Sequence, residues 1–167
     1  MPRNQVDSAV TLSVLDRLTD LDPKSPSVEG PLSRAESIRI LKAGLRRDLE
    51  WLLNTRRTAE EPDDGTAEVG RSVYFYGLPD FSTYSIASPK DQAKLVRALQ
   101  TAIKVFEPRL AKVRVVPLEA NIIGTRSIRL RLEGLLMMDP APELISFDTT
   151  LQLTTGDFQV RGESDAG

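Results

Sequence analysis

Apolar residues recur at helical spacing in a stretch that begins about thirty residues into the chain. Ser33 and Glu36 have the spacing of a capping box, in which each side chain satisfies a free backbone N–H at the start of a helix. The charged residues of this stretch fall outside the apolar stripe, so one face suits a core and the other suits solvent or a partner. The pattern predicts a helix from about Arg34 to Asn54, with one apolar stripe that consists of Ile38, Leu41, Leu45, Leu49 and Leu52.

A second amphipathic stretch predicts a helix that begins at Pro89 and ends before Pro108. Ser88 is a suitable N-cap, Pro89 takes the first helical position, where its missing N–H does no harm, and Asp91 completes the cap. Pro108 disfavours helical geometry at Glu107, so the helix must end there. Its apolar face consists of Leu95, Val96, Leu99, Ala102, Ile103 and Phe106.

The last third of the chain alternates apolar and polar residues with a period of two, which is typical of strands with one buried face. Residues 112–118 alternate weakly, residues 128–138 alternate clearly, and residues 145–153 predict a further strand. A tight turn at Gly156 precedes residues 158–161, so the last two strands are expected to form a hairpin. We predict an α+β fold, with two main helices packed on one face of a small, mainly antiparallel sheet.

The first 31 residues are predicted to form an extended N-terminal arm outside the core. Leu12, Leu15 and Leu18 recur every three residues, whereas proline and glycine interrupt the rest of the segment. Two interpretations are open: a disordered tail, or a peptide that folds on a partner with these leucines as anchors. Residues 32–162 are predicted to form one α+β domain, and residues 163–167 a disordered tail.

The segment between the two helices has two predicted parts. Residues 59–70 are polar, with four acidic residues between positions 60 and 64, and predict a surface loop. Residues 73–76 have the composition of a strand, and residues 77–80 have that of a turn. The aromatic residues here are expected to pack into the core beneath the turn.

Composition excludes several kinds of site. The chain has no cysteine, which excludes disulfides, thiolate metal sites and a cysteine nucleophile, and no histidine, which removes the commonest general base and metal ligand. A formal net charge of -2 gives no overall attraction to nucleic acid or to an anionic membrane. No apolar run reaches the ~20 residues that span a bilayer, and the N-terminus lacks the apolar stretch of a secretory signal. We therefore predict a cytoplasmic protein without a cofactor, a metal or direct membrane insertion.

Glu107, Pro108 and Arg109 place a carboxylate and a guanidinium on a stiffened turn between the second helix and the first strand. This arrangement suits a bidentate contact with a neighbouring protein. A glycosidase would need two carboxylates around the scissile bond, one of which carries a proton. Arg109 would keep Glu107 ionised, and no second acid stands in a recognisable relation to it. Peptidoglycan cleavage through Glu107 is therefore kept only as an alternative.

Arg126, Arg129 and Arg131 could follow phosphates along an exposed sheet face. A sheet that binds nucleic acid usually also offers aromatic residues for base stacking, and these strands have none on their polar face. The alternative is a solvent-facing strand on which Glu133 balances the arginines. We predict no nucleic-acid partner.

Three groups of residues together resemble a known family. They are the Glu107-Pro108-Arg109 step, the run 72–82 with its Tyr-Gly-Leu-Pro-Asp turn at 76–80, and the stretches 47–50 and 53–56 of the first helix. The chain resembles the TssE subunits of bacterial type VI secretion baseplates, which are related to a lysozyme-like baseplate wedge protein of contractile phage tails. The resemblance covers about residues 32–160.

The resemblance implies a non-enzymatic subunit of a baseplate wedge that links the baseplate to the contractile sheath and helps to initiate sheath assembly. It implies the baseplate partners TssF, TssG and TssK, the sheath partners TssB and TssC, and a cytoplasmic baseplate docked at the inner membrane of a Gram-negative bacterium. The terminal strand, expected at a sheet edge, could accept a partner strand. A wedge protein of another contractile injection particle is the remaining alternative. The predicted partner-binding residues are Glu107, Pro108, Arg109, Arg47, Glu50 and Arg56, with Leu12, Leu15 and Leu18 on the arm.

Overall fold

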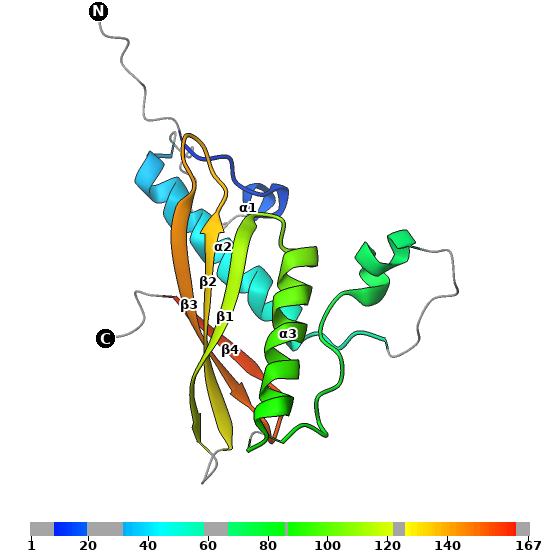
Figure 1. Cartoon of the computed structure of the whole chain (residues 1–167). Coiled ribbons are helices and arrows are strands. Elements are labelled where there is room, and N and C mark those ends of the chain that lie inside the picture. Colours follow the sequence, from blue (N-terminus) through cyan, green and yellow to red (C-terminus); the bar gives the residue numbers. More distant parts are fainter. Residues whose placement is uncertain (1–8, 20–31, 59–66, 86, 122–125, 163–167) are drawn as a thin grey trace, which may run out of the picture.

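Two long helices lie on one face of a four-stranded sheet (Figure 1). The computed structural model describes residues 9–19, 32–58, 67–85, 87–121 and 126–162. The predicted α+β fold is confirmed. The elements are α1 (Val14–Leu18), α2 (Arg34–Asn54), the 3₁₀ helices η1 (Ala67–Arg71) and η2 (Val73–Phe75), α3 (Pro89–Phe106), and the strands β1 (Leu110–Asn121), β2 (Ser127–Leu136), β3 (Glu143–Gln152) and β4 (Phe158–Gly162).

The capping residues set the boundaries of both long helices, as the sequence predicted. The Ser33 hydroxyl accepts a hydrogen bond from the Glu36 N–H at 3.2 Å, and the Ser88 hydroxyl accepts one from the Asp91 N–H at 3.3 Å. Glu107 is the C-cap of α3, and its N–H donates to a carbonyl one turn back at 2.8 Å. These local contacts explain why both helices could be predicted without knowledge of the fold.

The four strands follow one another in space in their order along the chain, and each neighbouring pair is antiparallel. In β2 and β3, buried residues alternate with half-buried or exposed ones, so the helices cover only one face of the sheet. Gly156, in the turn before β4, has a φ of 78°, which glycine adopts readily. The predicted final hairpin is confirmed, and β1 and β4 are the two edge strands.

The core lies between the long helices and the covered face of the sheet. Leu45 and Leu49 of α2 and Ile103 of α3 have no exposed surface. Full burial of a side chain of this size stabilises a fold by about 1.5–3 kcal/mol, so the two apolar stripes account for the docking of both helices. The sheet contributes Ile128, Leu130, Leu132, Leu136, Phe147, Leu151 and Phe158 to the same core.

Residues 73–76 do not form a strand, although their composition predicted one. The first three form η2, and the hydroxyl of Ser72 accepts a hydrogen bond from the Tyr74 N–H at 3.3 Å. Aromatic and β-branched residues favour a strand where a pleated neighbour offers a surface to pack on, and this segment joins none of the described strands. Residues 73–75 therefore adopt the short 3₁₀ helix η2 in place of a strand.

The aromatic residues around this turn divide between the core and the surface. Phe81 is buried, and its ring meets that of Phe158 edge to face with centroids 5.8 Å apart. Tyr76 is half-buried against Phe106, with centroids 5.3 Å apart, whereas Tyr74 is 45% exposed. The predicted core packing is confirmed for Phe81 and Tyr76 and is wrong for Tyr74.

Residues 9–19 of the predicted arm lie against α2. The Val10 N–H donates to the Ser37 hydroxyl at 2.9 Å, and Val10 and Leu12 pack against the core. The rest of the predicted arm, the acidic stretch 60–64 and the predicted tail 163–167 lie outside the described residues.

Candidate partner-binding site

The Glu-Pro-Arg step folds back on itself at the C-terminal end of α3. Arg109 donates two hydrogen bonds to the Glu107 carboxylate, from Nε to Oε1 at 2.6 Å and from Nη2 to Oε2 at 2.5 Å. The Arg109 backbone N–H also donates to Oε1, at 3.3 Å. Pro108 stands between them and is exposed. The bidentate contact that the sequence suggested for a neighbouring protein is therefore made within the chain.

A series of alternating charges continues from this turn to α2 and α1. Nη2 of Arg109 donates to Oδ2 of Asp48 at 2.6 Å. The other Asp48 oxygen accepts hydrogen bonds from Arg47, at 2.8 Å from Nη2 and 3.0 Å from Nε. Nη2 of Arg47 lies 2.9 Å from Oδ1 of Asp16. We call these five residues, Glu107, Arg109, Asp48, Arg47 and Asp16, the ion chain.

The ion chain is buried at its two ends and open in its middle. The side chains of Glu107 and Asp16 are 6% and 4% exposed, whereas those of Arg109, Asp48 and Arg47 are 24%, 23% and 31% exposed. A buried carboxylate is strongly unfavourable unless a cation pairs with it. Glu107 therefore needs Arg109 as its counter-ion, and Asp16 needs Arg47. The hydrogen bonds to Glu107 raise the pKa of the Arg109 guanidinium despite its partial burial. The three middle residues remain accessible to a partner.

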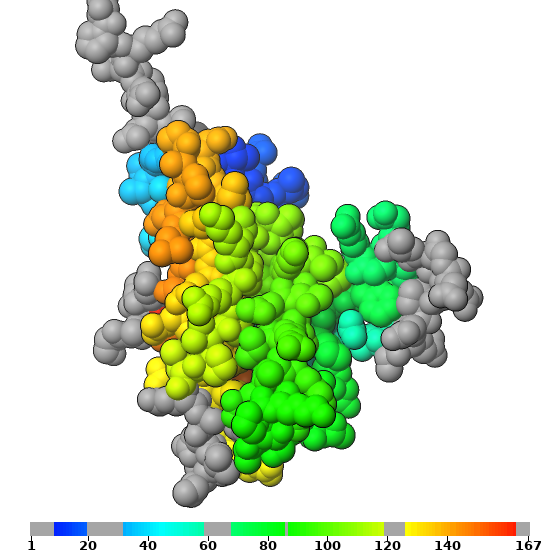
Figure 2. All heavy atoms as spheres, in the orientation of Figure 1, coloured from blue at the N-terminus to red at the C-terminus, as the bar shows by residue number. Residues whose placement is uncertain are grey.

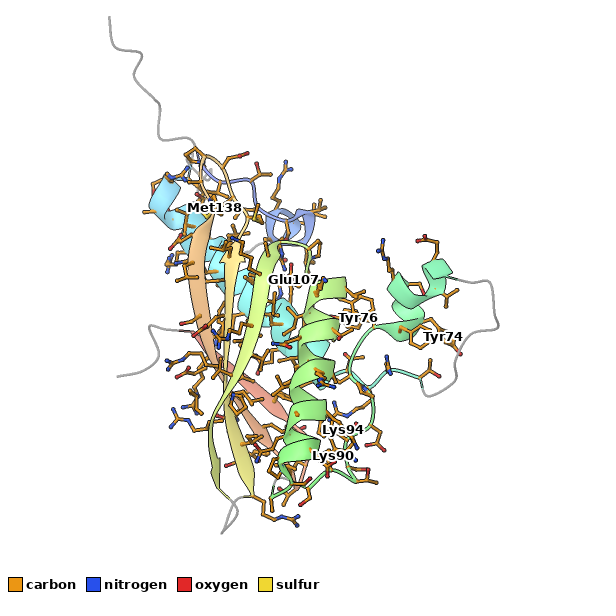
Figure 3. All side chains as sticks on the ribbon, in the orientation of Figure 1. Tyr74, Tyr76, Lys90, Lys94, Glu107 and Met138 are labelled. Carbon is orange, nitrogen blue, oxygen red and sulfur yellow. The ribbon has the colours of Figure 1, made fainter. Side chains whose placement is uncertain are left out.

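Two aromatic residues border this open middle. The Arg47 guanidinium lies 5.2 Å from the ring centroid of Trp51, which is one turn further along α2 and is 55% exposed. Burial raises the pKa of the Tyr76 phenol, and the negative charges of Asp48 and Glu107 add to this effect. Glu107 and Tyr76 lie beside the same end of α3 (Figure 3). A partner that contacts the ion chain at Arg47 would therefore also meet Trp51.

Gly44 allows α1 to approach α2 closely. A Cβ at this position would lie 2.7 Å from Oδ2 of Asp16, which is closer than such atoms pack. The same carboxylate accepts a hydrogen bond from the Ser13 hydroxyl at 2.5 Å, and the Ser13 hydroxyl in turn accepts one from the Asp16 N–H. The described part of the arm is thus held on α2 by a carboxylate that sits over a glycine.

The three leucines predicted to anchor the arm on a partner do not form one surface. Leu12 packs against the core of the chain itself. Leu15 and Leu18 are 48% and 78% exposed, and Val14 beside them is 69% exposed. Contact of Leu15 and Leu18 with a partner stays a prediction.

Arg56, another predicted contact residue, lies just beyond the C-terminal end of α2, away from the ion chain. Its Nη2 donates to the Gly156 carbonyl at 2.6 Å, and its guanidinium lies 4.3 Å from the ring centroid of Phe81. Burial lowers the pKa of the Arg56 guanidinium, and the charges of Asp80 and Asp157 oppose that shift. Arg56 ties α2 to the turn between β3 and β4.

Residues next to Arg56 complete this junction. Nδ2 of Asn54 donates to the Phe158 carbonyl at 2.9 Å, and its Oδ1 accepts from the Phe158 N–H at 2.8 Å. Gly77 has a φ of 109°, and a Cβ there would collide with the Thr55 carbonyl oxygen. The Leu78 N–H donates to that oxygen at 2.8 Å. Two segments that carry the resemblance, 53–56 and 76–80, therefore pack against each other.

The structure brings Glu107, Arg109 and Arg47 together and separates them from Arg56. Glu50 is half-buried on α2, and its carboxylate forms no ion pair among the described residues. Its contact with a partner stays a prediction.

Asp48, Asp16 and Trp51 belong to the candidate site, although none of them was among the predicted contact residues and only Asp48 lies in a stretch that carries the resemblance. The sequence carries a signal for Asp48, because it lies beside Leu45 and Leu49 of the apolar stripe, where a carboxylate needs a cation. Asp16 and Trp51 have no comparable signal, since their roles depend on how α1 lies on α2.

Other kinds of site find no support in the part of the chain that the structure describes. No group of three or more acidic residues there could hold a metal ion, and no helix there is long and apolar enough to cross a membrane. Asp148 pairs with two of the three arginines considered for nucleic acid: Nε of Arg131 donates to it at 2.9 Å, and Nη2 of Arg129 lies 4.0 Å from it.

Comparison with known proteins identifies the family. A family model described as baseplate wedge protein gp25 matches residues 39–141, which include every residue of the ion chain except Asp16. Neither a search of the curated proteins nor a search of the solved structures finds a match. Because the matched residues make up more than half of its length, the chain belongs to the baseplate wedge protein gp25 family.

Proposed function

We propose that this chain is a non-enzymatic structural subunit of a type VI secretion baseplate wedge, which links the baseplate to the contractile sheath and helps to initiate sheath assembly. The observation that carries the proposal is the family match over residues 39–141, which supports a structural role in the baseplate of a contractile tail. The resemblance to TssE subunits supports the more specific assignment to a secretion system in the cytoplasm, docked at the inner membrane.

The geometry of Glu107 favours a structural role over peptidoglycan cleavage. Both of its carboxylate oxygens accept hydrogen bonds from Arg109, and its side chain is 6% exposed. The general acid of a glycosidase has to hold a proton and reach the glycosidic oxygen. A carboxylate that is nearly inaccessible, with both oxygens bonded to a guanidinium, is poorly placed to reach a substrate.

The proposed contact surface for TssF, TssG and TssK is the open middle of the ion chain together with Trp51. Arg47, Asp48 and Arg109 are partly exposed there, and Trp51 adds a large apolar side chain of the kind that often anchors an interface. Their mutual pairing holds the charges in place before a partner arrives, which lowers the entropy lost on binding.

The proposed contact with the sheath proteins TssB and TssC is strand addition at an edge of the sheet. β4 is an edge strand, as predicted, but the Asn54 amide already binds the N–H and carbonyl of Phe158. A partner strand therefore has to pair with β4 beyond Phe158 or replace the Asn54 side chain.

Co-purification of the tagged chain from its host, followed by mass spectrometry, tests this function. The wild-type chain should recover TssF, TssG, TssK, TssB and TssC. Trp51→Ala should lose the wedge subunits while its melting temperature stays close to that of the wild type, because Trp51 is 55% exposed. Lys90→Ala is the matched control, since Lys90 is exposed at the opposite end of α3 from Glu107 (Figure 3).

Three other results would change the assignment. Recovery of wedge and sheath proteins from a different contractile particle would replace the secretion system by that particle. Recovery of peptidoglycan fragments would instead support the alternative of a peptidoglycan-cleaving enzyme. Recovery of no baseplate protein by the wild-type chain would overturn the proposal.

A further inference from the structure

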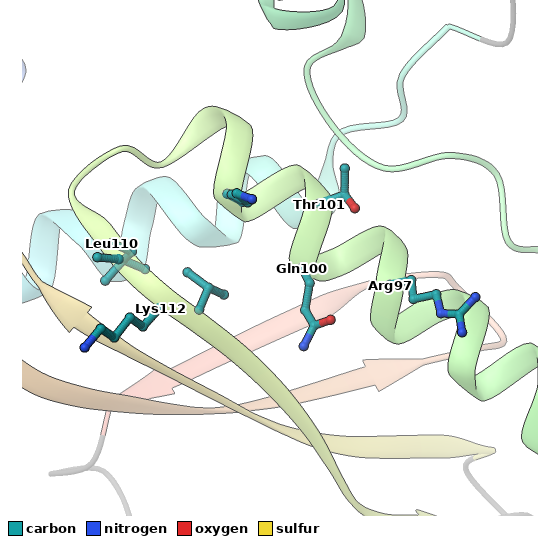
Figure 4. Close-up of a pocket in the computed structure, with 8 residues that line it drawn as sticks. Arg97, Gln100, Thr101, Leu110 and Lys112 are labelled. Atoms are coloured by element: carbon teal, nitrogen blue, oxygen red, sulfur yellow. The ribbon is translucent and has the colours of Figure 1, made fainter.

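An open groove with a volume of about 660 Å³ lies between α3 and the edge strand β1 (Figure 4). Its helical side carries Arg97, Gln100 and Lys104, which share one face of α3 because they are three and four residues apart. Its strand side consists of residues 110–113 of β1. Figure 2 shows α3 and β1 next to each other on one exposed face of the molecule.

Among the residues that the structure describes, the groove is lined by three cations and by no acidic residue. The side chains of Arg97, Lys104 and Lys112 are exposed, and none of them forms an ion pair or a hydrogen bond in the part of the chain that the structure describes. The chain as a whole has a net charge of -2, so the positive charge is a local property of this groove. Three unpaired cations around one cavity attract an anionic partner.

The backbone of β1 is distorted at the groove. Lys112 has a φ of 53°, which is uncommon for a residue with a side chain. The pairing of β1 with β2 shifts register between Ala111 and Arg114, so Lys112 lies in a bulge. A bulge redirects side chains and interrupts the row of free backbone groups along a strand edge. An occupant of the groove is therefore recognised by side chains and not by strand addition.

We propose that this groove binds an acidic segment of a partner protein. Aspartate or glutamate side chains of that segment pair with Arg97, Lys104 and Lys112, and its apolar side chains pack on Val113 of the strand. Charge complementarity identifies the occupant, and the apolar part of the wall favours a peptide over a fully charged polymer. The inference does not depend on the assignment to a secretion system.

A peptide-binding titration tests the inference. The probe is a fluorescein-labelled synthetic peptide in which glutamate alternates with leucine, and the anisotropy of its fluorescence is measured as the full chain is added at low salt. The double variant Arg97→Glu with Lys104→Glu should bind the peptide at least about tenfold more weakly than the wild type, because two attractions become repulsions. It should instead bind a peptide in which lysine alternates with leucine.

A matched variant reverses the same amount of charge outside the groove. Arg39 and Lys90 are exposed and do not line the groove, so Arg39→Glu with Lys90→Glu should bind the glutamate peptide within about twofold of the wild type. The amide NMR signals that shift on binding should be those of residues 97–104 and 110–113. Equal loss of binding in both double variants, or shifts centred on another face, would overturn the inference.

Two further outcomes would replace the proposed occupant. Tighter binding of a single-stranded RNA oligonucleotide or of polyphosphate than of the glutamate peptide would identify a nucleic-acid or polyanion site. A chain whose acids at 60–64 are replaced by serine could also bind the glutamate peptide at least about tenfold more tightly than the wild type. That result would show that the chain's own acidic segment occupies the groove.

Discussion

The two strongly charged regions of this molecule are built in opposite ways. In the ion chain, each of the five charged groups lies within hydrogen-bonding distance of an opposite charge, and its two end carboxylates are nearly inaccessible. In the groove between α3 and β1, Arg97, Lys104 and Lys112 are exposed and have no partner among the described residues. The ion chain first uses its charges to join distant segments of the fold and exposes only its already paired middle residues to a partner, whereas the groove leaves its charges unpaired. A charged motif in a sequence therefore does not by itself mark an interface.

The largest expected effect is the loss of one end of the ion chain. In Glu107→Ala, the half-buried Arg109 keeps Asp48 as its one remaining ion-pair partner among the described residues. We therefore expect the free energy of unfolding, measured by urea denaturation, to fall by about 3 kcal/mol. Glu50→Ala is the control and should change stability by less than about 0.5 kcal/mol, because its half-buried carboxylate has no ion pair among the described residues. Equal stability of Glu107→Ala and the wild type would show that the ion chain does not support the fold.

A smaller effect on stability, but a clear local one, is expected at the other end of the ion chain. The Cβ of Gly44→Ala meets the Asp16 carboxylate, so α1 should move off α2 and the Val10 amide should lose protection in hydrogen exchange. Alanine favours helix over glycine by about 1 kcal/mol, so total stability should change by less than that amount.

A double-mutant cycle isolates this contact. In an Asp16→Ala background no carboxylate remains at Gly44, so Gly44→Ala should stabilise the protein by about 1 kcal/mol. Full additivity of the two substitutions would mean that Asp16 and Gly44 are not coupled.

Alkaline pH should weaken the ion-chain region through Tyr76. Its pKa in the folded protein is raised by burial and by the charges of Asp48 and Glu107, whereas the unfolded chain has the ordinary value of about 10. Stability is therefore fully present below that value and falls as the pH rises through the folded pKa, because the folded state resists ionisation. Urea denaturation between about pH 8 and pH 11 should show a steeper loss for the wild type than for Tyr76→Phe. Parallel pH profiles would contradict this coupling.

The smallest effect on stability is expected in the groove. Arg97→Ala with Lys104→Ala removes two exposed cations that have no partner among the described residues, so the free energy of unfolding should stay within about 0.5 kcal/mol of the wild type. Thermal and urea denaturation measure this directly. A large loss would show that these cations support the fold and would remove the contrast with the ion chain.

Prediction from the sequence succeeded where the decisive contacts are local. The N-terminal ends of α2 and α3 follow from hydrogen bonds between residues three apart, such as Ser33 with Glu36, the C-terminal end of α3 follows from Pro108, and the final hairpin follows from a turn at Gly156. It failed for residues 73–76, because residues with a strand-like composition form a strand only where a neighbouring strand is available to pair with.

The candidate site shows the same division. Glu107 and Arg109 stand out in the sequence, and the physical reasoning that they can form a bidentate contact holds. The sequence could not show that they contact each other and Asp48, because Asp48 lies 61 residues from Arg109 and meets it only after α2 and α3 have docked. The sequence did not mark the three cations of the groove, since exposed lysines and arginines occur on any solvated helix or strand.

By itself, the sequence determined the two helices, the strand periodicity and the α+β class. It also determined that cysteine and histidine, and the sites that require them, are absent. Periodicity, capping and composition act over a few residues, so they can be read along the chain. Only the tertiary structure decided which charges are paired in the ion chain and which stay open beside β1. That decision depends on the distance and burial of side chains from separate elements, and these are set when the core closes.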